Sequence, residues 1–247
     1  MDNIFANRLK DLSNQSTRNG KFTFTNFLSL DELSTVKNSE RELGCFSLFG
    51  GTDGCERVIA RFGSPEDLGY EVDFPICCLM IKPKLKKFAD ECTHRDFLGA
   101  LMNLGIERAC IGDIIVKDSV AYVFVLDKMA DFICENLTKV RHTVVLAEKS
   151  FLPEQESLFT LEDKTVIVSS LRLDCIISAL YNLSRNDSSA LFADKKVFVQ
   201  GKICENISHQ VKQNEVISVR GAGRFIIDSI SGQTKKGRLC LNLKIYK

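Results

Sequence analysis

The sequence predicts an α+β fold built from three small domains. We expect an N-terminal α+β unit over residues 1–73, a ferredoxin-like βαββαβ unit over residues 74–150, and a basic domain over residues 165–247 that follows a linker at 151–164. Three observations support this division. Helix-type and strand-type periodicity alternate in the middle third, a polar stretch with Pro153 and four acids interrupts the apolar pattern, and basic residues concentrate after it.

Length and composition exclude several classes of protein. The chain has 247 residues, of which 45% are apolar and 26% charged, the balance of a soluble globular protein. No apolar run reaches the roughly 18 residues that a membrane-spanning helix needs, and the N-terminus lacks the basic and apolar regions of a signal peptide. We therefore expect a cytoplasmic protein that makes no membrane contact.

The cysteines and histidines predict no cofactor. The 10 cysteines are scattered without a C-x-x-C pair, and most sit in apolar runs, as Cys77 and Cys78 do, which indicates reduced and buried thiols. The three histidines, His94, His142 and His209, lie in separate segments with neither metal-ligand spacing nor a nucleophile motif. We predict no metal, no cofactor and no enzymatic activity.

The first unit begins with helical periodicity. An amphipathic helix is predicted over Asn3–Leu12, and a polar loop follows it through Gly20. After the aromatic segment Phe22–Leu30, the residues Ser29 to Glu32 are typical of a helix start, with acids in the first turn.

A glycine-rich segment, Gly50–Gly54, separates two strand-like runs, Cys45–Phe49 and Glu56–Phe62. A phosphate-binding loop would need a helix behind it, with its N–H groups directed at the ligand. The residues from Arg57 to Arg61 alternate as a strand does, so the segment is predicted to be a hairpin turn.

The second unit shows a clearer alternation of strand-type and helix-type sequence patterns. Its predicted order is strand, helix, strand, strand, helix, strand, which is the order of the ferredoxin-like fold shared by RNA-recognition domains. Thr93–Asp96 is a possible capping arrangement for the first helix, and Asp127 is predicted to cap the second. The elements are Ile76–Ile81, Phe97–Leu104, Ile111–Val116, Val120–Leu126, a helix from Asp127 through Leu137, and Thr143–Leu146.

Two aromatic residues of this unit have two interpretations. Tyr122 and Phe124 alternate on one face of the strand Val120–Leu126, where RNA-recognition domains stack bases. Packing inside the protein is the competing interpretation, and no basic signature surrounds the pair. The sequence leaves the question open.

Charge is divided unevenly along the chain. The formal net charge is only +1, but residues 165–247 carry 13 Lys or Arg and six Asp or Glu, a charge of +7, which leaves −6 on residues 1–164. A basic module on an acidic body is typical of nucleic-acid binding.

The basic module opens with two predicted helices. Leu173, Ile176, Ile177 and Leu180 have helical spacing, and a second, shorter helix begins after Ser184, a favourable N-cap. Strands are predicted at Lys195–Lys202 with a turn at Gln200-Gly201, then at Val216–Arg220, Phe225–Ile230 and Arg238–Tyr246.

The motifs of this module carry a family resemblance. R-L-D, S-R some ten residues later, V-x-V-x-G-K, and I-S-V-R-G-x-G-R-F together resemble the RNA-binding domain first described in the fourth small-subunit ribosomal protein, here called the S-four domain, over Arg172–Ile227. With two α/β units in front and T-K-K-G-R at Thr234–Arg238, the chain resembles the YlmH family of bacterial RNA-binding proteins. That resemblance implies a role on the large ribosomal subunit in ribosome-associated quality control, and a genetic neighbourhood with cell division.

The resemblance also implies which residues face RNA. Cations at helix starts and hairpin ends meet phosphates, and glycines let the backbone approach closely. The block of three cations near the end has a solvated turn as its alternative interpretation. The expected RNA-binding residues are Arg172, Ser184, Arg185, Asn186, Lys195, Lys196, Lys202, Arg220, Gly223, Arg224, Lys235, Lys236 and Arg238.

Two motifs in the module have enzymatic look-alikes. Arg172-Leu173-Asp174 is similar to the catalytic aspartate motif of pseudouridine synthases, but a helix-start Asp explains it, and no room for a synthase domain remains. The glycines at 221 and 223 precede a strand rather than the helix that a dinucleotide site requires. Two features depart from the family pattern: Gln200 stands where many such domains have Asn, and the run from Asp187 to Ser189 is more polar than usual.

The prediction is therefore a monomeric, non-catalytic RNA-binding protein that docks on ribosomal RNA of the large subunit, with transfer RNA as a further candidate partner. Two alternatives remain open: an RNA-modifying enzyme with its centre in the first two units, and a scaffold linked to cell division. Neither the RNA element nor the role of the N-terminal unit follows from the sequence.

Overall fold

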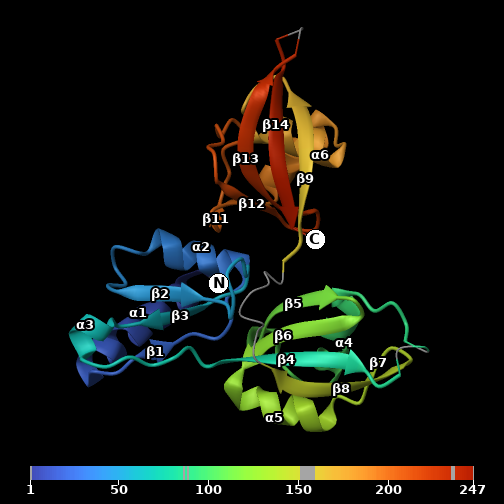
Figure 1. Cartoon of the computed structure of the whole chain (residues 1–247). Helices are drawn as coiled ribbons and strands as arrows, with labels where there is room; N and C mark the ends of the chain where they lie inside the picture. The colour runs from blue at the N-terminus through green and yellow to red at the C-terminus, as the bar shows by residue number, and fades with distance from the viewer. Residues whose placement is uncertain (1, 86, 88, 151–158, 235–236, 247) are drawn as a thin grey trace. The chain divides into compact units, whose positions relative to one another are not determined.

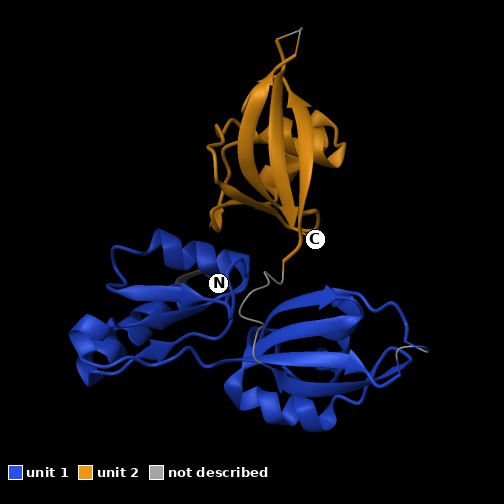
Figure 2. Cartoon of the chain, in the orientation of Figure 1, with its two compact units in different colours: residues 1–158 blue, residues 159–247 orange. Residues whose placement is uncertain are grey.

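The computed structural model describes residues 2–85, 87, 89–150, 159–234 and 237–246. The chain forms two compact units, Met1–Leu158 and Phe159–Lys247 (Figure 2). The fold class is α+β, as predicted, with three sheets, of which two lie in the first unit and one in the second. The predicted boundary at residue 73 falls inside the first unit and stays a prediction.

The first sheet of the first unit is small and antiparallel, in the order β1-β3-β2 (Figure 1). Ser29 and Glu32 form the capping box that starts α2: the Ser29 hydroxyl accepts from the Glu32 N–H, and the Glu32 carboxylate accepts from the Ser29 N–H at 2.8 Å. The elements are α1 (Asp2–Asn19), β1 (Thr23–Phe24), α2 (Leu30–Asn38), β2 (Phe46–Phe49), β3 (Ile59–Phe62) and α3 (Pro65–Leu68).

Helix α1 is longer than predicted, since it continues from Leu12 to Asn19 through residues expected to form a loop. The Ser13 hydroxyl donates to the Leu43 carbonyl at 2.7 Å, and the buried Ser16 hydroxyl donates to the Phe62 carbonyl at 3.1 Å. These tertiary hydrogen bonds hold the polar second half of the helix, and local sequence alone does not encode them.

The glycine-rich segment joins β2 to β3, which pair as an antiparallel hairpin from Phe49 and Ile59 outward. The hairpin prediction is confirmed, although β3 begins at Ile59 and not at Glu56. A strand follows the glycines, and so the phosphate-loop alternative has no helix to support it.

The second sheet of the first unit is antiparallel, in the order β5-β6-β4-β8-β7. It has the predicted βαββαβ succession, with the two-residue strand β7 in addition. The elements are β4 (Ile76–Pro83), α4 (His94–Asn103), η2 (Arg108–Cys110), β5 (Ile111–Lys117), β6 (Val120–Leu126), α5 (Asp127–Asn136), β7 (Lys139–Val140) and β8 (Thr143–Ser150).

Two details of this sheet differ from the prediction. Asp127 is the first residue of α5 and its N-cap is Leu126, so the Asp127 carboxylate lies in the first helical turn and does not cap the helix. Strand β8 continues to Ser150, because Ser150 still pairs with Cys78 of β4. The capping box of α4 is present as predicted, with Asp96 Oδ2 accepting from the Thr93 N–H at 2.8 Å.

The two sheets of the first unit are joined through Arg57. Its guanidinium donates to the carbonyls of Ile111 at 3.0 Å, Phe27 at 3.1 Å and Arg108 at 3.3 Å. Asp113 of β5 accepts in turn from the Arg57 N–H. Burial lowers the pKa of Arg57, which is the expected effect of desolvation on a cation held among backbone carbonyls.

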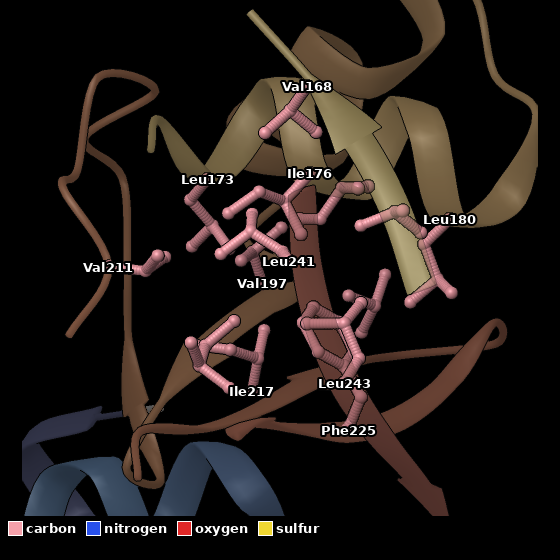
Figure 3. Close-up of a cluster of buried hydrophobic side chains, with 14 of the residues drawn as sticks. Val168, Leu173, Ile176, Leu180, Val197, Val211, Ile217, Phe225, Leu241 and Leu243 are labelled. Atoms are coloured by element: carbon pink, nitrogen blue, oxygen red, sulfur yellow. The ribbon is translucent and has the colours of Figure 1, made fainter. Parts of the chain in front are cut away.

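The second unit is a six-stranded antiparallel sheet in the order β11-β10-β12-β13-β14-β9, with two helices against it (Figure 1). Its core is a single cluster in which Leu173, Ile176, Ile217, Phe225 and Leu241 are each 0% exposed (Figure 3). The elements are β9 (Leu161–Val168), α6 (Leu173–Tyr181), α7 (Arg185–Ala193), β10 (Val197–Val199), β11 (Lys202–Ile203), β12 (Val216–Val219), β13 (Gly223–Gln233) and β14 (Leu239–Tyr246).

Strand β9 overlaps the segment predicted as a linker. Leu161 already pairs with Tyr246, and Asp163 pairs with Lys244. The acidic residues of this segment are compatible with a strand because β9 is at the edge of the sheet, where polar side chains reach solvent. Residues 151–158 lie outside the described residues.

The cysteines are less buried than expected. Three of them, Cys78, Cys110 and Cys204, are buried, Cys45 is exposed, and the remaining six are partly buried. No helix among the described residues has the length and apolar content to cross a membrane.

Candidate nucleic-acid interface

Four of the cations singled out in the second unit gather at one end of its sheet. The N–H of Arg220 donates to the carbonyl of Lys196 at 2.8 Å, which places the end of β12 beside the start of β10. Val219 pairs with Val197 on one side and with Gly223 on the other. We call Lys195, Lys196, Arg220, Gly223 and Arg224 the basic end of the sheet.

Helix α7 leads into this end, and the N–H of Lys196 donates to the carbonyl of Leu191 in its last turn. Ser184 is its N-cap: the Ser184 hydroxyl accepts from the Asp187 N–H at 3.1 Å and donates to the Asp187 carboxylate at 2.7 Å. The last residue of α6, Tyr181, has its hydroxyl 3.4 Å from the point where a Cβ on Gly223 would lie. The Tyr181 side chain thereby reaches the basic end, and Lys195 and Lys196 of that end directly follow the C-cap of α7, Asp194.

The turn from Gly221 to Gly223 needs glycine at both positions. Their φ angles are +86° and +136°, in the left-handed range that L side chains rarely adopt. Arg220 and Arg224 flank this turn, so only small residues separate the two arginines and the backbone between them is accessible. A phosphate can approach such a surface closely.

Both arginines are held by aromatic rings. The guanidinium carbon of Arg220 lies 5.3 Å from the centre of the Phe198 ring, and that of Arg224 lies 4.4 Å from the centre of the Tyr246 ring. A cation over an aromatic face is attracted by the ring quadrupole and loses little freedom when it binds an anion.

Both lysines of the basic end have acidic partners. Lys195 Nζ lies 3.2 Å from Glu205, and Lys196 Nζ lies 2.9 Å from Asp194. All four side chains are 42–65% exposed, so solvent screens both pairs and they contribute little stability. A phosphate competes with these carboxylates at small cost.

Arg185 is the first residue of α7 and is exposed. Within the part of the chain that the structure describes, its side chain forms no ion pair. The unsatisfied N–H groups of the helix start add a positive field beside it, and Asn186, also exposed, follows in the same turn. The Asp187 carboxylate of the same turn opposes this field, so Arg185 is the group through which the helix start attracts an anion.

Other expected residues lie elsewhere. Arg172 is the N-cap of α6 and binds the Asp174 carboxylate with both Nε (3.0 Å) and Nη2 (2.9 Å), which raises the pKa of Arg172. Lys202 pairs with Val199 at the opposite end of β10. Arg238 follows the far end of β13, an 11-residue strand that spans about 36 Å at ~3.3 Å per residue. Lys235 and Lys236 lie outside the described residues.

The bidentate pair also bears on the synthase-like motif. Asp174 lies in the first turn of α6, and both of its carboxylate oxygens accept hydrogen bonds from Arg172. The helix-start interpretation of Asp174 is the one that the geometry supports.

The sequence reasoning missed Tyr181 and Tyr246. The Tyr181 hydroxyl is buried with no hydrogen-bond partner among the described residues, and burial raises its pKa to about 12. Tyr246 lies under Arg224, and the Phe159 ring meets it edge-on at 5.6 Å. Helical spacing alone does not show where the Tyr181 side chain lies. The alternation of side chains along β14, which can be read from the sequence, puts Tyr246 on the outer face of the sheet.

Tyr122 and Phe124 of β6 have different surroundings. They point to the same face of the second sheet, but Phe124 is 1% exposed, and its ring lies directly against Gly51 of the hairpin turn. For Phe124 the packing interpretation is confirmed. Tyr122 is half-buried, and its stacking on a base stays a prediction.

Fold and surface together define a class of protein: an α+β chain in which a βαββαβ unit precedes a basic unit of two helices on a sheet. Comparison with known proteins agrees. The family model described as "Putative RNA-binding domain in YlmH" matches residues 70–153. The ribosome-associated protein quality control protein P2 of Bacillus subtilis (strain 168) is 32% identical over 197 residues, 76% of this chain and 73% of that protein.

A solved structure shows the same fold. The cell division protein ylmH from Streptococcus pneumoniae aligns with a TM-score of 0.51 at 20% identity, over 63% of this chain and 94% of that one. The chain belongs to the YlmH family.

Proposed function

We propose that the protein binds RNA on the ribosome through the basic end of its second unit, as an S-four-type module over Arg172–Ile227. The observation that carries this proposal is the convergence of Lys196, Arg220 and Arg224 around a bare glycine turn. Lysine and arginine side chains around a glycine turn suit phosphates and the shape of a folded RNA, so we propose backbone and shape recognition as its main contribution.

Three further observations support the proposal. The charge of +7 on residues 165–247 provides long-range attraction to a polyanion, while the −6 on the rest of the chain opposes indiscriminate binding. The matched family model is described as an RNA-binding domain. The relative from Bacillus subtilis is named for ribosome-associated quality control. We therefore place the RNA partner on the ribosome.

The finer assignment follows from the same surface. We propose ribosomal RNA of the large subunit as the main partner and transfer RNA as a second, for a cytoplasmic monomer that performs no catalysis. The arrangement at Asp174, whose carboxylate is occupied by Arg172, supports a binding role over an RNA-modifying one.

The test is sedimentation with purified ribosomes over a series of salt concentrations. The double variant Arg185→Ala/Lys196→Ala is expected to bind at least about tenfold more weakly, because each lost phosphate contact removes a released counterion. The control Lys212→Ala removes an exposed cation of the same unit that lies outside the basic end and is expected to sediment like the parent.

The outcomes separate the parts of the proposal. Equal sedimentation of the double variant and the parent would refute the assignment of the basic end and of the start of α7 as the RNA-binding surface. A parent protein that stays in the supernatant at moderate salt would refute the ribosomal function and leave the scaffold alternative. Crosslinking with sequencing of the attached RNA then decides between the large subunit, transfer RNA and other partners.

A further inference from the structure

A cleft in the first unit lies outside the proposed RNA-binding surface. It has a volume of about 490 Å³, in the range of small-molecule sites, and it opens where the β2–β3 turn meets the starts of β4 and α5. Its wall combines aromatic rings, Phe49, Phe74 and Phe124, with charged groups, Asp73, Asp127 and Lys149.

The aromatic side of the cleft is preorganised. The Phe49 and Phe74 rings lie with their centroids 5.4 Å apart, and the Arg61 guanidinium carbon lies 4.9 Å from the centre of the Phe74 ring. Phe49 is 38% exposed, although it is a large apolar side chain, whereas Phe124 is buried beneath the Gly51 backbone. The cleft therefore offers one accessible aromatic surface over a fixed apolar floor.

The polar side of the cleft is rich in acceptors. Asp73 and Asp127 supply carboxylates, and burial raises the pKa of Asp127, as expected for a group at an apolar wall. Lys149 supplies the cation, with its Nζ 2.6 Å from Asp131 at the cleft's outer side. A ligand that fits has a flat ring for the phenylalanines and N–H donors for the carboxylates, with its negative charge near Lys149.

We propose that this cleft takes one unstacked nucleobase of an RNA strand, of the kind that carries an exocyclic amino group. A base provides both the π-face and the amino donor, and its phosphate is placed toward Lys149. An aromatic side chain of a protein partner fits the apolar wall but brings no amino group for Asp73 and Asp127. The inference rests on the proposed RNA-binding function and adds a base-reading site to it.

The location supports the same occupant. Of the six side chains named, five lie within residues 70–153, the segment matched by the RNA-binding family model, and Phe49 comes from the N-terminal sheet that packs on it. Gly51 has a φ of +107° and its backbone contacts the Phe124 ring, so the segment that carries Phe49 is fixed against the second sheet.

The test compares two pyrimidine hexanucleotides, fluorescein-labelled r(C)6 and r(U)6, by fluorescence anisotropy with the full-length protein. Cytosine has an amino group where uracil has a carbonyl oxygen, so r(C)6 is expected to bind several-fold more tightly. Phe49→Ala is expected to weaken binding of r(C)6 about tenfold, the effect of losing one base–aromatic stack. Asp127→Ala is expected to reduce the preference for r(C)6 over r(U)6, and Asp73→Ala/Asp127→Ala to abolish it.

Matched controls keep the test specific. Phe132→Ala removes a phenylalanine that is 42% exposed on α5, and Glu135→Ala removes an exposed carboxylate from the same helix. Neither residue lines the cleft, so both variants should bind like the parent. Melting temperatures confirm that each variant is folded, and Asp127→Ala tests the site independently of Phe49.

Each outcome decides the question. Equal affinity for the two hexanucleotides, or a preference that survives Asp73→Ala/Asp127→Ala, overturns the inference. Binding of free CMP as tight as that of r(C)6 overturns RNA as the source of the base. Repeating the titration with Arg185→Ala/Lys196→Ala separates the two proposals, because the preference for r(C)6 depends on the cleft alone and ribosome sedimentation on the basic end.

Discussion

Gly51 and Phe124 are in such close contact that a Cβ on Gly51 would lie 2.2 Å from Cδ1 of the Phe124 ring. Gly51 belongs to the hairpin turn of the N-terminal sheet and Phe124 to the central strands of the second sheet. The contact buries Phe124, whose position on the strand had suggested that it could stack on a base. The two sheets of the first unit thus share a packed boundary.

The substitution Gly51→Ala is expected to destabilise the protein by roughly 3 kcal/mol. The added methyl group overlaps the Phe124 ring, and the φ of +107° is strained for any L side chain. Urea denaturation measures the change in the free energy of unfolding. As a control, Gly99→Ala in α4 meets no atom within 4 Å and is expected to stabilise the helix by about 0.5–1 kcal/mol. A Gly51→Ala protein as stable as the parent would show that the boundary is not packed in this way.

The Arg57 guanidinium predicts a second stability effect. Arg57→Lys keeps the charge but replaces a planar group, which reaches three carbonyls, with a single ammonium. We expect a loss of roughly 2–3 kcal/mol, because at least one partly buried carbonyl loses its donor. Thermal or urea denaturation provides the measurement, and the exposed Arg41→Lys is the control. A loss of less than half a kcal/mol would contradict a role for Arg57 in joining the sheets.

The capping box of α4 predicts a pH effect. The N–H of Thr93 donates to Asp96, which lowers the pKa of this carboxyl below its usual 3.8. A lowered folded-state pKa contributes stability above the unfolded-state value, and this contribution is lost as the pH falls through the folded-state pKa. Asp96→Asn should therefore flatten the acid side of the stability profile. Melting temperatures between about pH 6 and pH 2.5 measure it.

The control for that experiment is Asp118→Asn, which removes a carboxylate from the exposed β5–β6 turn and matches the change in net charge. Parallel profiles for the parent and Asp96→Asn would mean that the cap does not contribute to the stability of α4 in solution.

Local signals predicted local structure well. The helix start at Ser29, the capping arrangement at Thr93, the Ser184 N-cap and the Gln200-Gly201 turn each follow from a few neighbouring residues. What the sequence did not predict depends on distant partners. The second half of α1 is held by Leu43 and Phe62, and Phe124 is covered by a turn more than seventy residues earlier in the chain.

The candidate interface shows the same division. Sequence periodicity predicted that the cations lie at helix starts and strand ends. Only the strand pairing shows that Lys196, Arg220 and Gly223 lie together at one end of the sheet of the second unit. The cleft had no sequence signal of its own, because its aromatic and acidic residues come from both sheets of the first unit.

The last prediction concerns the two ends of β10. Lys196 precedes this three-residue strand at the basic end, whereas Lys202 pairs with Val199 at its other end, about 10 Å away along the strand. We expect Lys196→Ala to lower the slope of log K against log salt, for binding to ribosomes, by about one unit, as for one lost phosphate contact. Lys202→Ala should leave that slope unchanged and alter the affinity by less than about twofold. Equal slopes for the two variants would contradict an interface confined to one end of the sheet, because the RNA would then have to contact both ends of the β10–β11 hairpin.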